Sequence, residues 1–285
     1  MVDDSAILKL ITMKIYILFI IPIIVAYSCT KDKKLNVFSL SQDKQLGGQL
    51  DHEIRTNKAE YPLLDSATNP DVYKYLYQMR DDILSSNEIF HRDDFNWRVT
   101  VINKNVLNAF AAPGGKIYVY TGLLKFVKSG AELAGILAHE ITHADRRHST
   151  DQMTKVYGFQ MVLNVILGSD TTGLVKTMAR NMASGAASLA WSRDNESEAD
   201  SMAVEFLWSI KNRKAYQINA LSNFFKRMDS LGLGTTSTTI AWLQDHPLDA
   251  TRISSVDGHW KRLGSPVGNL FSNEYFTVIA RLPKY

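Results

Sequence analysis

Two histidines and one glutamate between residues 139 and 143 have the types and the spacing of a catalytic zinc site. His139 and His143 are four residues apart, so on a helix their imidazoles lie on one face and can bind the same ion. Glu140 lies about 100° round the helix axis from His139, within reach of a water on that ion. In this His-Glu-x-x-His pattern the glutamate accepts a proton from a water that the metal acidifies. We therefore expect one Zn²⁺ ion per chain and hydrolytic chemistry.

A pattern of this kind also arises by chance, on the order of once in a hundred chains of this length. The residues around it must therefore show whether it is a metal site or a chance match. Apolar residues recur at helical spacing at Leu133, Ile136, Leu137 and Ile141, and no proline interrupts them. This periodicity predicts a buried helix, whereas a chance match is more typical of a loop or a polar helix face. Two histidines leave the site short of a third protein ligand, which must come from another part of the chain.

The segment 192–200, with the sequence SRDNESEAD, offers acidic residues for that third ligand. Glu196 and Asp200 are four residues apart at the start of a predicted helix and face the same way. We expect Glu196 to supply an oxygen ligand and Asp200 to accept the second ring N–H of a ligand histidine. Glu198 lies about 200° round the helix from Glu196 and is the alternative ligand. An acidic first turn also stabilises a helix by itself, which would explain one of these carboxylates.

One more histidine, His148, follows the pair. It lies five residues after His143, about 140° round a straight helix, so we expect it to point elsewhere and to be structural or exposed. The longer pattern HExxHxxGxxH, with a third histidine ligand, requires glycine at position 146 and histidine at position 149. This chain has Arg146 and Ser149 there, so the longer pattern is absent.

The elements that must position these residues are a small sheet and several helices. Strands are expected at 95–102, 106–112 and 116–120, with Pro113-Gly114-Gly115 as the turn between the last two. Further helices are expected at 41–57, 69–85, 122–128, 154–167 and 174–189, and from 192 onward. The expected fold class is α+β, mostly helical, with a small, mostly antiparallel sheet beside the metal helix.

Asn108, Ala109 and Phe110 begin a stretch of small residues that leads toward the metal helix. If this stretch is an edge strand, its free backbone groups can pair with an extended peptide, the usual way in which a protease holds its substrate. An ordinary core strand is the alternative. We expect these three residues to contact the substrate.

The first 28 residues have the features of a secretory signal peptide, with residues 1–12 as an upstream start-site extension. The apolar run from Ile15 to Tyr27 is about 13 residues long, too short to span a bilayer. It ends in Ala-Tyr-Ser before Cys29, which resembles the lipid-attachment site of a bacterial lipoprotein. A chance cysteine after an uncleaved anchor is the alternative.

Composition is consistent with this organisation. The chain has 285 residues, of which 45% are hydrophobic, enough for a substantial core. The 32 basic and 29 acidic residues leave a net charge of +3 without a long basic block, so no nucleic-acid partner is expected. We expect a polar tether over 29–40 and a zinc metallopeptidase domain over 41–285. With a single cysteine, that domain has no internal disulfide.

Four separated motifs between 108 and 252 occur in one order: NAFAAPGG followed by GLL, then HExxH, then SRDNESEAD, then His-Pro with an arginine. Together they resemble the HtpX and CAAX prenyl protease family of gluzincin metallopeptidases, particularly its periplasmic, lipoprotein or soluble bacterial branch. The resemblance implies a zincin-type fold and zinc bound by His139, His143 and Glu196. It also implies that Glu140 is the general base.

The resemblance extends to His246 and Arg252. Relatives carry a His-Pro close to the metal, and His246 could donate to the oxyanion or fill the open coordination position when no peptide is bound. Arg252, one turn into the next helix, could pair with Asp200 or another acidic group, or stabilise the transition state. A loop-capping histidine and a surface arginine are the alternatives.

These features predict an endopeptidase of the bacterial cell envelope, held at a membrane by an N-terminal lipid with its domain in the periplasm. The family likeness suggests unfolded or misassembled envelope proteins as substrates. The alternative is a non-catalytic, zinc-stabilised chaperone or binding lipoprotein. An intramembrane prenyl-protein protease is disfavoured, because the chain lacks the several long apolar spans which that role needs.

Overall fold

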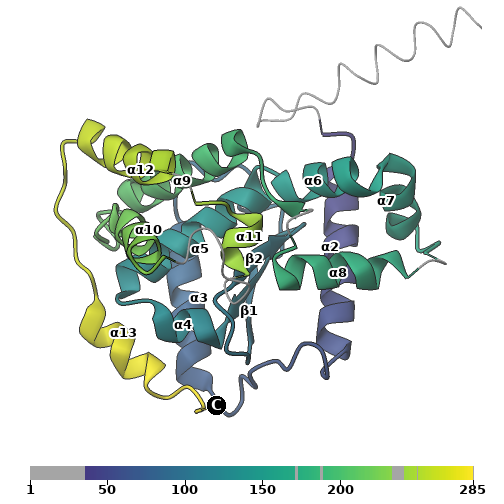
Figure 1. Cartoon of the computed structure of the whole chain (residues 1–285), viewed down its shortest axis with the longest axis horizontal. Coiled ribbons are helices and arrows are strands. Elements are labelled where there is room, and N and C mark those ends of the chain that lie inside the picture. The colour runs from purple at the N-terminus through teal and green to yellow at the C-terminus, as the bar shows by residue number, and fades with distance from the viewer. Residues whose placement is uncertain (1–35, 171–172, 187–188, 233–240, 249, 285) are drawn as a thin grey trace, which may run out of the picture. The chain divides into compact units, whose positions relative to one another are not determined.

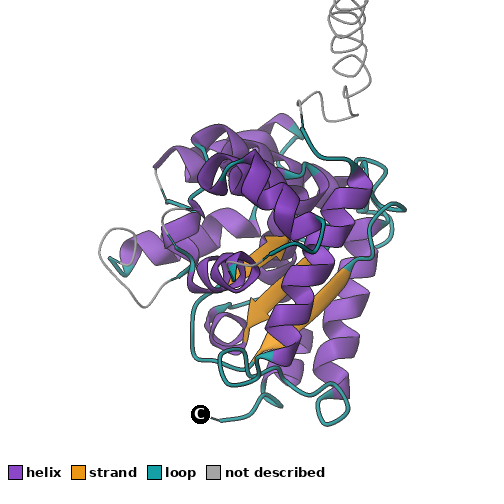
Figure 2. Ribbon diagram, turned by 90° about the vertical axis from the view of Figure 1, so that its right-hand side faces the viewer, coloured by secondary structure: helices purple, strands orange, loops and turns teal. Residues whose placement is uncertain are grey.

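In the computed structural model of this chain, a three-stranded mixed sheet lies among helices (Figure 2). Its strands are β1 (Arg98–Ile102), β2 (Ala109–Ala112) and β3 (Lys116–Tyr120), in the order β1-β3-β2. β2 and β3 form an antiparallel hairpin, whereas β1 pairs with β3 in the parallel direction. The sheet is therefore mixed rather than mostly antiparallel, because the chain leaves β1 and passes to the far side of β3 before turning back.

The structure describes residues 36–170, 173–186, 189–232, 241–248 and 250–284. The helices within these ranges surround the sheet (Figure 1). They are α2 (Leu40–Thr56), α3 (Pro70–Leu84), α4 (Thr121–Phe126), α5 (Gly130–Asp145), α6 (His148–Tyr157), α7 (Phe159–Ile166), α8 (Leu174–Ser184), α9 (Arg193–Ser209), α10 (Ala220–Ser230), α11 (Trp242–Asp245), α12 (Ala250–Arg262) and α13 (Ser272–Ile279). This arrangement confirms the mostly helical α+β fold class.

Helix α5 is the centre of the fold and carries the His-Glu-x-x-His pattern. All 16 of its residues are buried, because it packs against α9 and α10 as well as the sheet. Ser129 caps its first turn by accepting a hydrogen bond from the backbone N–H of Glu132 at 3.1 Å. A metal site on this helix is therefore held by a rigid, fully packed element.

The remaining helices form two groups around α5. In Figure 1, α2, α6, α7 and α8 lie on one side of the sheet, and α9, α10 and α12 lie on the other. The helix expected at 154–167 is two helices, because Gly158 adopts φ 83°, a left-handed conformation that ends α6. The helix expected at 174–189 ends at Ser184, where Gly185 is also left-handed.

Residues 40–285 form one compact unit, and residues 1–39 form a second unit, of which only 36–39 are described. The predicted signal peptide and Cys29 lie outside the described residues. Across the described ranges, no helix combines the length and the apolar character that a membrane span requires.

Candidate metal centre

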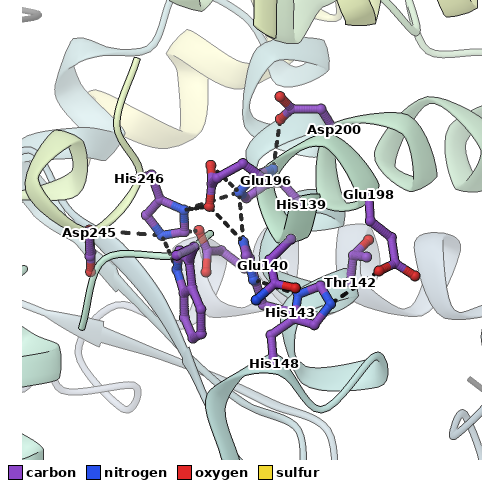
Figure 3. Close-up of polar contacts among 12 residues, drawn as sticks. His139, Glu140, Thr142, His143, His148, Glu196, Glu198, Asp200, Asp245 and His246 are labelled. Atoms are coloured by element: carbon purple, nitrogen blue, oxygen red, sulfur yellow. Dashed lines mark hydrogen bonds and ion pairs between the residues drawn. The ribbon is translucent and has the colours of Figure 1, made fainter. Parts of the chain in front are cut away.

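Three side chains from two helices converge on one point in the core (Figure 3). The Nε2 atoms of His139 and His143 on α5 lie 3.0 Å apart. Glu196, in the first turn of α9, places Oε1 3.3 Å from His143 Nε2 and Oε2 3.7 Å from His139 Nε2. All three side chains are buried. Two imidazoles and a carboxylate are the donors of a catalytic zinc site, so this group fits the metal that the sequence predicts.

The protonation of these donors also suits a cation. Burial holds the pKa of His143 well below its usual value, so the imidazole is neutral, as a metal ligand must be. Burial by itself would raise the pKa of Glu196, but the positive charges of Arg252 and the nearby histidines outweigh it. The pKa of Glu196 therefore lies well below its usual value, and its carboxylate is ionised.

Glu140 lies next to the ligand group and is completely buried. Its Oε1 accepts a hydrogen bond from Trp242 Nε1 at 3.1 Å. Its Oε2 is buried and has no hydrogen-bond partner among the described residues, which leaves one oxygen able to accept from a water. Burial raises the pKa of Glu140 to about 7, the value that suits a group that takes up and releases a proton near neutral pH.

Asp200 and Arg252 contact the ligand side chains and hold them in position. Asp200 Oδ1 lies 2.9 Å from His139 Nδ1, the contact expected for it from the spacing. Arg252 donates to both oxygens of Asp200, at 2.8 and 2.7 Å, and its Nη1 lies 2.6 Å from Glu196 Oε2. The guanidinium thus bridges two buried carboxylates of α9. It contacts the ligand Glu196 and is not itself among the donor atoms of the metal position.

His246, at the end of α11, reaches the same group of donor atoms. Its Nδ1 lies 2.9 Å from Glu196 Oε1 and 3.2 Å from His139 Nε2. The ring stacks on Trp242 with centroids 4.7 Å apart, and Trp191 Nε1 donates to its Nε2 at 3.3 Å. These contacts place His246 as a fourth possible ligand in the conformation seen here.

Glu198, the alternative third ligand, lies away from the ligand group. It faces the other side of α9, where its carboxylate contacts His148 at 3.3 Å and Arg146 at 3.4 Å. His148 is only 1% exposed and touches His143, so the expectation that it points elsewhere is wrong. The reason is that α5 ends at Asp145 and the chain turns before α6 begins.

The predicted substrate strand is at the edge of the sheet, because β2 pairs with β3 alone. Its residues are nevertheless covered: Asn108 and Ala109 are fully buried and Phe110 is 3% exposed. Asn108 Nδ2 donates to the carbonyl of Ala183 at 3.1 Å, at the end of α8. The outer backbone edge is also partly occupied, because the carbonyl of Ala111 accepts a hydrogen bond from Ser149 Oγ of α6 at 2.7 Å.

Trp242 and Trp191 belong to the site, but sequence reasoning missed both. Trp242 contacts Glu140 and His246, and Trp191 stacks on His143 with centroids 4.5 Å apart. Neither has a spacing that marks a ligand. The only local signal was that each aromatic residue lies close in sequence to a predicted site residue.

Comparisons with known proteins agree with this geometry. The sequence model of peptidase family M48 matches residues 73–259, more than half of the chain. Mitochondrial metalloendopeptidase OMA1 of Arabidopsis thaliana is 34% identical over 142 residues, which cover 50% of this chain and 28% of that protein. Metalloprotease YcaL of Escherichia coli strain K12 is 29% identical over 154 residues, which cover 53% of this chain and 57% of that protein.

A third relative matches more of the chain. The Beta-barrel assembly-enhancing protease of Escherichia coli strain K12 is 23% identical over 257 residues, which cover 86% of this chain and 49% of that protein. The chain spans less than two thirds of the length of each of these three relatives.

Proposed function

The chain belongs to peptidase family M48, a family of zinc metalloproteases, and from this premise we propose that it is an endopeptidase. The observation that carries the proposal is the buried convergence of His139, His143 and Glu196 beside Glu140. We assign the first three as the zinc ligands and Glu140 as the general base. When bound, zinc supplies an acidified water and polarises the scissile carbonyl.

The residues around the ligands then have separate tasks. Glu140 Oε2 accepts the proton of the attacking water, and the same carboxylic acid later donates it to the departing amine. Trp242 holds the other oxygen of Glu140 and so orients the carboxylate. Asp200 accepts from His139 Nδ1–H, which leaves His139 Nε2 free for the metal.

We propose that His246 occupies the fourth position of the site while no peptide is bound, because it lies within the donor group. Once it moves aside, its imidazole can donate to the oxyanion of the tetrahedral intermediate. We assign Arg252 a positioning role, since its guanidinium contacts Asp200 and Glu196 and is itself 3% exposed.

Substrate is proposed to add as a strand along Asn108, Ala109 and Phe110. These residues are covered in this conformation, so peptide binding requires the start of α6 and the end of α8 to move away from β2. Unfolded chains suit such an edge, because an extended peptide has free backbone groups along its whole length.

We further propose that the protein acts in the bacterial cell envelope on unfolded or misassembled proteins, with a lipid on Cys29. The apolar run ahead of Cys29 and the likeness to a protease named for β-barrel assembly support this proposal. Replacing Cys29 by serine should move the protein from the membrane fraction to the soluble fraction. A wild-type protein that is already soluble would contradict the lipid anchor.

The activity is tested by incubating the purified full-length protein with casein, with and without a chelator. Cleavage that stops on chelation and returns on addition of zinc is the expected result. The variant Glu140→Gln should retain zinc without cleavage. A protein that binds unfolded casein without cutting it, at any zinc concentration, would instead support the non-catalytic binding module.

A further inference from the structure

The two histidines that face the metal position are supported in different ways. His139 Nδ1 lies 2.9 Å from a carboxylate oxygen of Asp200, a direct contact. His143 Nδ1 lies 3.0 Å from a second imidazole nitrogen, Nδ1 of His148 (Figure 3). No spacing rule requires this second contact, and the proposed reaction does not use His148. Its presence in the core therefore needs an explanation of its own.

The chemistry of the ligand determines the direction of this hydrogen bond. His143 Nε2 faces the other donors, so it must be unprotonated to bind a metal, and the single proton of the neutral ring is then on Nδ1. Two nitrogens 3.0 Å apart can share only one proton. His143 Nδ1–H therefore donates, and His148 Nδ1 must be the acceptor.

The direction of this first hydrogen bond also determines where His148 carries its own proton. If Nδ1 of His148 accepts, the proton of its neutral ring is on Nε2. His148 Nε2 lies 3.3 Å from Glu198 Oε2, so this N–H has a carboxylate to receive it. Arg146 Nε lies 3.4 Å from the other oxygen of Glu198, which holds the carboxylate in place. All the hydrogen bonds from Glu198 to His143 thus run in one consistent direction.

The backbone is shaped to bring His148 to this position. After α5 ends, Arg147 adopts φ 60°, the left-handed conformation that costs a non-glycine residue about 1 kcal/mol or more. A buried ion pair between Arg147 Nε and Asp43 of α2 holds this turn. On a helix that continued straight, His148 would point about 140° away from His143, so the turn is what brings the two rings together.

We propose that His148 and Glu198 are positioning residues that hold His143 in the tautomer that binds the metal. Glu198 accepts from His148, His148 accepts from His143, and the lone pair of His143 Nε2 is left for the ion. The inference concerns metal affinity rather than proteolysis, so it goes beyond the proposed activity. It also gives Glu198, rejected as a ligand, a task at the site.

The first test compares two substitutions of one side chain, with zinc affinity measured by competition with a chromogenic chelator. His148→Asn keeps an acceptor, because the asparagine Oδ1 occupies nearly the place of the histidine Nδ1, whereas His148→Leu removes it. Loss of an outer partner typically lowers metal affinity about 10–100-fold, and we expect this for His148→Leu. His148→Asn should stay within about threefold of wild type, since the acceptor for His143 remains.

The second test changes Glu198, the residue of this hydrogen-bonded series that lies farthest from the metal position. A substitution there should not disturb the fold. Glu198 has a side chain that is 30% exposed, so Glu198→Ala should fold normally. Its matched control is Glu205→Ala on the same helix, with a side chain that is 34% exposed and contacts His259. Glu198→Ala leaves no side-chain acceptor for His148 Nε2–H, so we expect it to lower zinc affinity about tenfold, the low end of the range for outer partners, and Glu205→Ala to leave it unchanged.

The third test reads the tautomers directly in zinc-loaded protein with ¹⁵N-labelled histidine. We expect His148 to carry its proton on Nε2 and His143 on Nδ1. A proton on Nδ1 of His148 would overturn the proposal, whatever the affinities are. Equal zinc affinities in His148→Leu, His148→Asn and wild type would also overturn it, and so would equal losses in Glu198→Ala and Glu205→Ala. A wild-type protein that binds no zinc would refute the metal centre itself, so the two failures are distinguishable.

Discussion

Replacing Arg252 by methionine should destabilise the zinc-free protein strongly, because the guanidinium is a buried bridge between two carboxylates. It contacts both oxygens of Asp200 and one oxygen of Glu196, at 2.6 to 2.8 Å, in a pocket where all three side chains are at most 4% exposed. Methionine has a similar length and can still pack on the ring of Phe225, 4.4 Å from the guanidinium carbon. The change therefore removes the positive charge together with its hydrogen bonds to Asp200.

Removing one partner of a buried ion pair costs about 3–5 kcal/mol of unfolding free energy, because the other partner is left uncompensated. The matched control is Arg180→Met, which removes a 2.8 Å ion pair with Glu60 in which the two side chains are 55% and 27% exposed. Exposed pairs contribute about 0–1 kcal/mol, so the control should change little. Urea unfolding of the zinc-free proteins at pH 7 measures both values.

The loss should also depend on pH. Burial by itself raises the pKa of Asp200 and Glu196, but Arg252 contributes the largest opposing effect and both pKa values lie below their usual 3.8 and 4.5. A lowered folded-state pKa gives stability that is present above the unfolded pKa and lost as pH falls through the folded pKa. Without Arg252 the carboxylates protonate more readily, so the difference between variant and wild type should shrink below about pH 4.

Bound zinc should reduce the loss of stability in Arg252→Met. A bound cation would compensate Glu196 in place of the guanidinium, so the loss in Arg252→Met should be smaller in the zinc-loaded protein. A loss below 1 kcal/mol in the zinc-free protein, or one equal to that of Arg180→Met, would refute the assignment of Arg252 as a bridge between buried charges.

Three further predictions concern the site. Glu140→Gln should retain zinc but lose at least about two orders of magnitude in turnover, the scale of general acid–base catalysis, and undiminished turnover would remove Glu140 from the mechanism. Metal analysis should find no zinc in Glu196→Ala and stoichiometric zinc in Glu198→Ala at high zinc concentration; the reverse result would exchange the roles of these two residues. Trp242→Phe removes a hydrogen bond that lowers the pKa of Glu140, so the acidic limb of the pH profile of kcat/KM should move to higher pH. An unshifted limb would show that another group determines it.

Much of the fold follows from local sequence patterns. Apolar residues at helical spacing predict α5, and Pro70 marks the start of α3, where the structure also begins that helix. The hairpin of β2 and β3 lies where the Pro-Gly-Gly turn places it, with Gly114 and Gly115 both at positive φ. These features depend on residues close together in the chain, so the sequence contains them directly.

The direction and the partners of segments that lie far apart in the sequence do not follow from local patterns. Nothing within β1 specifies that it joins β3 in the parallel direction, because the sheet order depends on how the connecting segment packs. The same limit applies to the cover over β2, where Asn108 contacts the end of α8, 75 residues further along the chain. Local pattern predicts a strand there but not whether its edge is accessible.

In the metal centre too, one part follows from local spacing and the other part depends on the tertiary structure. Helical spacing by itself determines that His139 and His143 share a face and that Glu196 and Asp200 share another, because the backbone geometry of one helix is enough. Packing of α9 against α5 decides that Glu196 rather than Glu198 meets the imidazoles, and a left-handed Arg147 decides that His148 reaches His143. Spacing describes residues within one continuous helix, and contacts between helices or across a break depend on the burial and charge pairing of the whole chain.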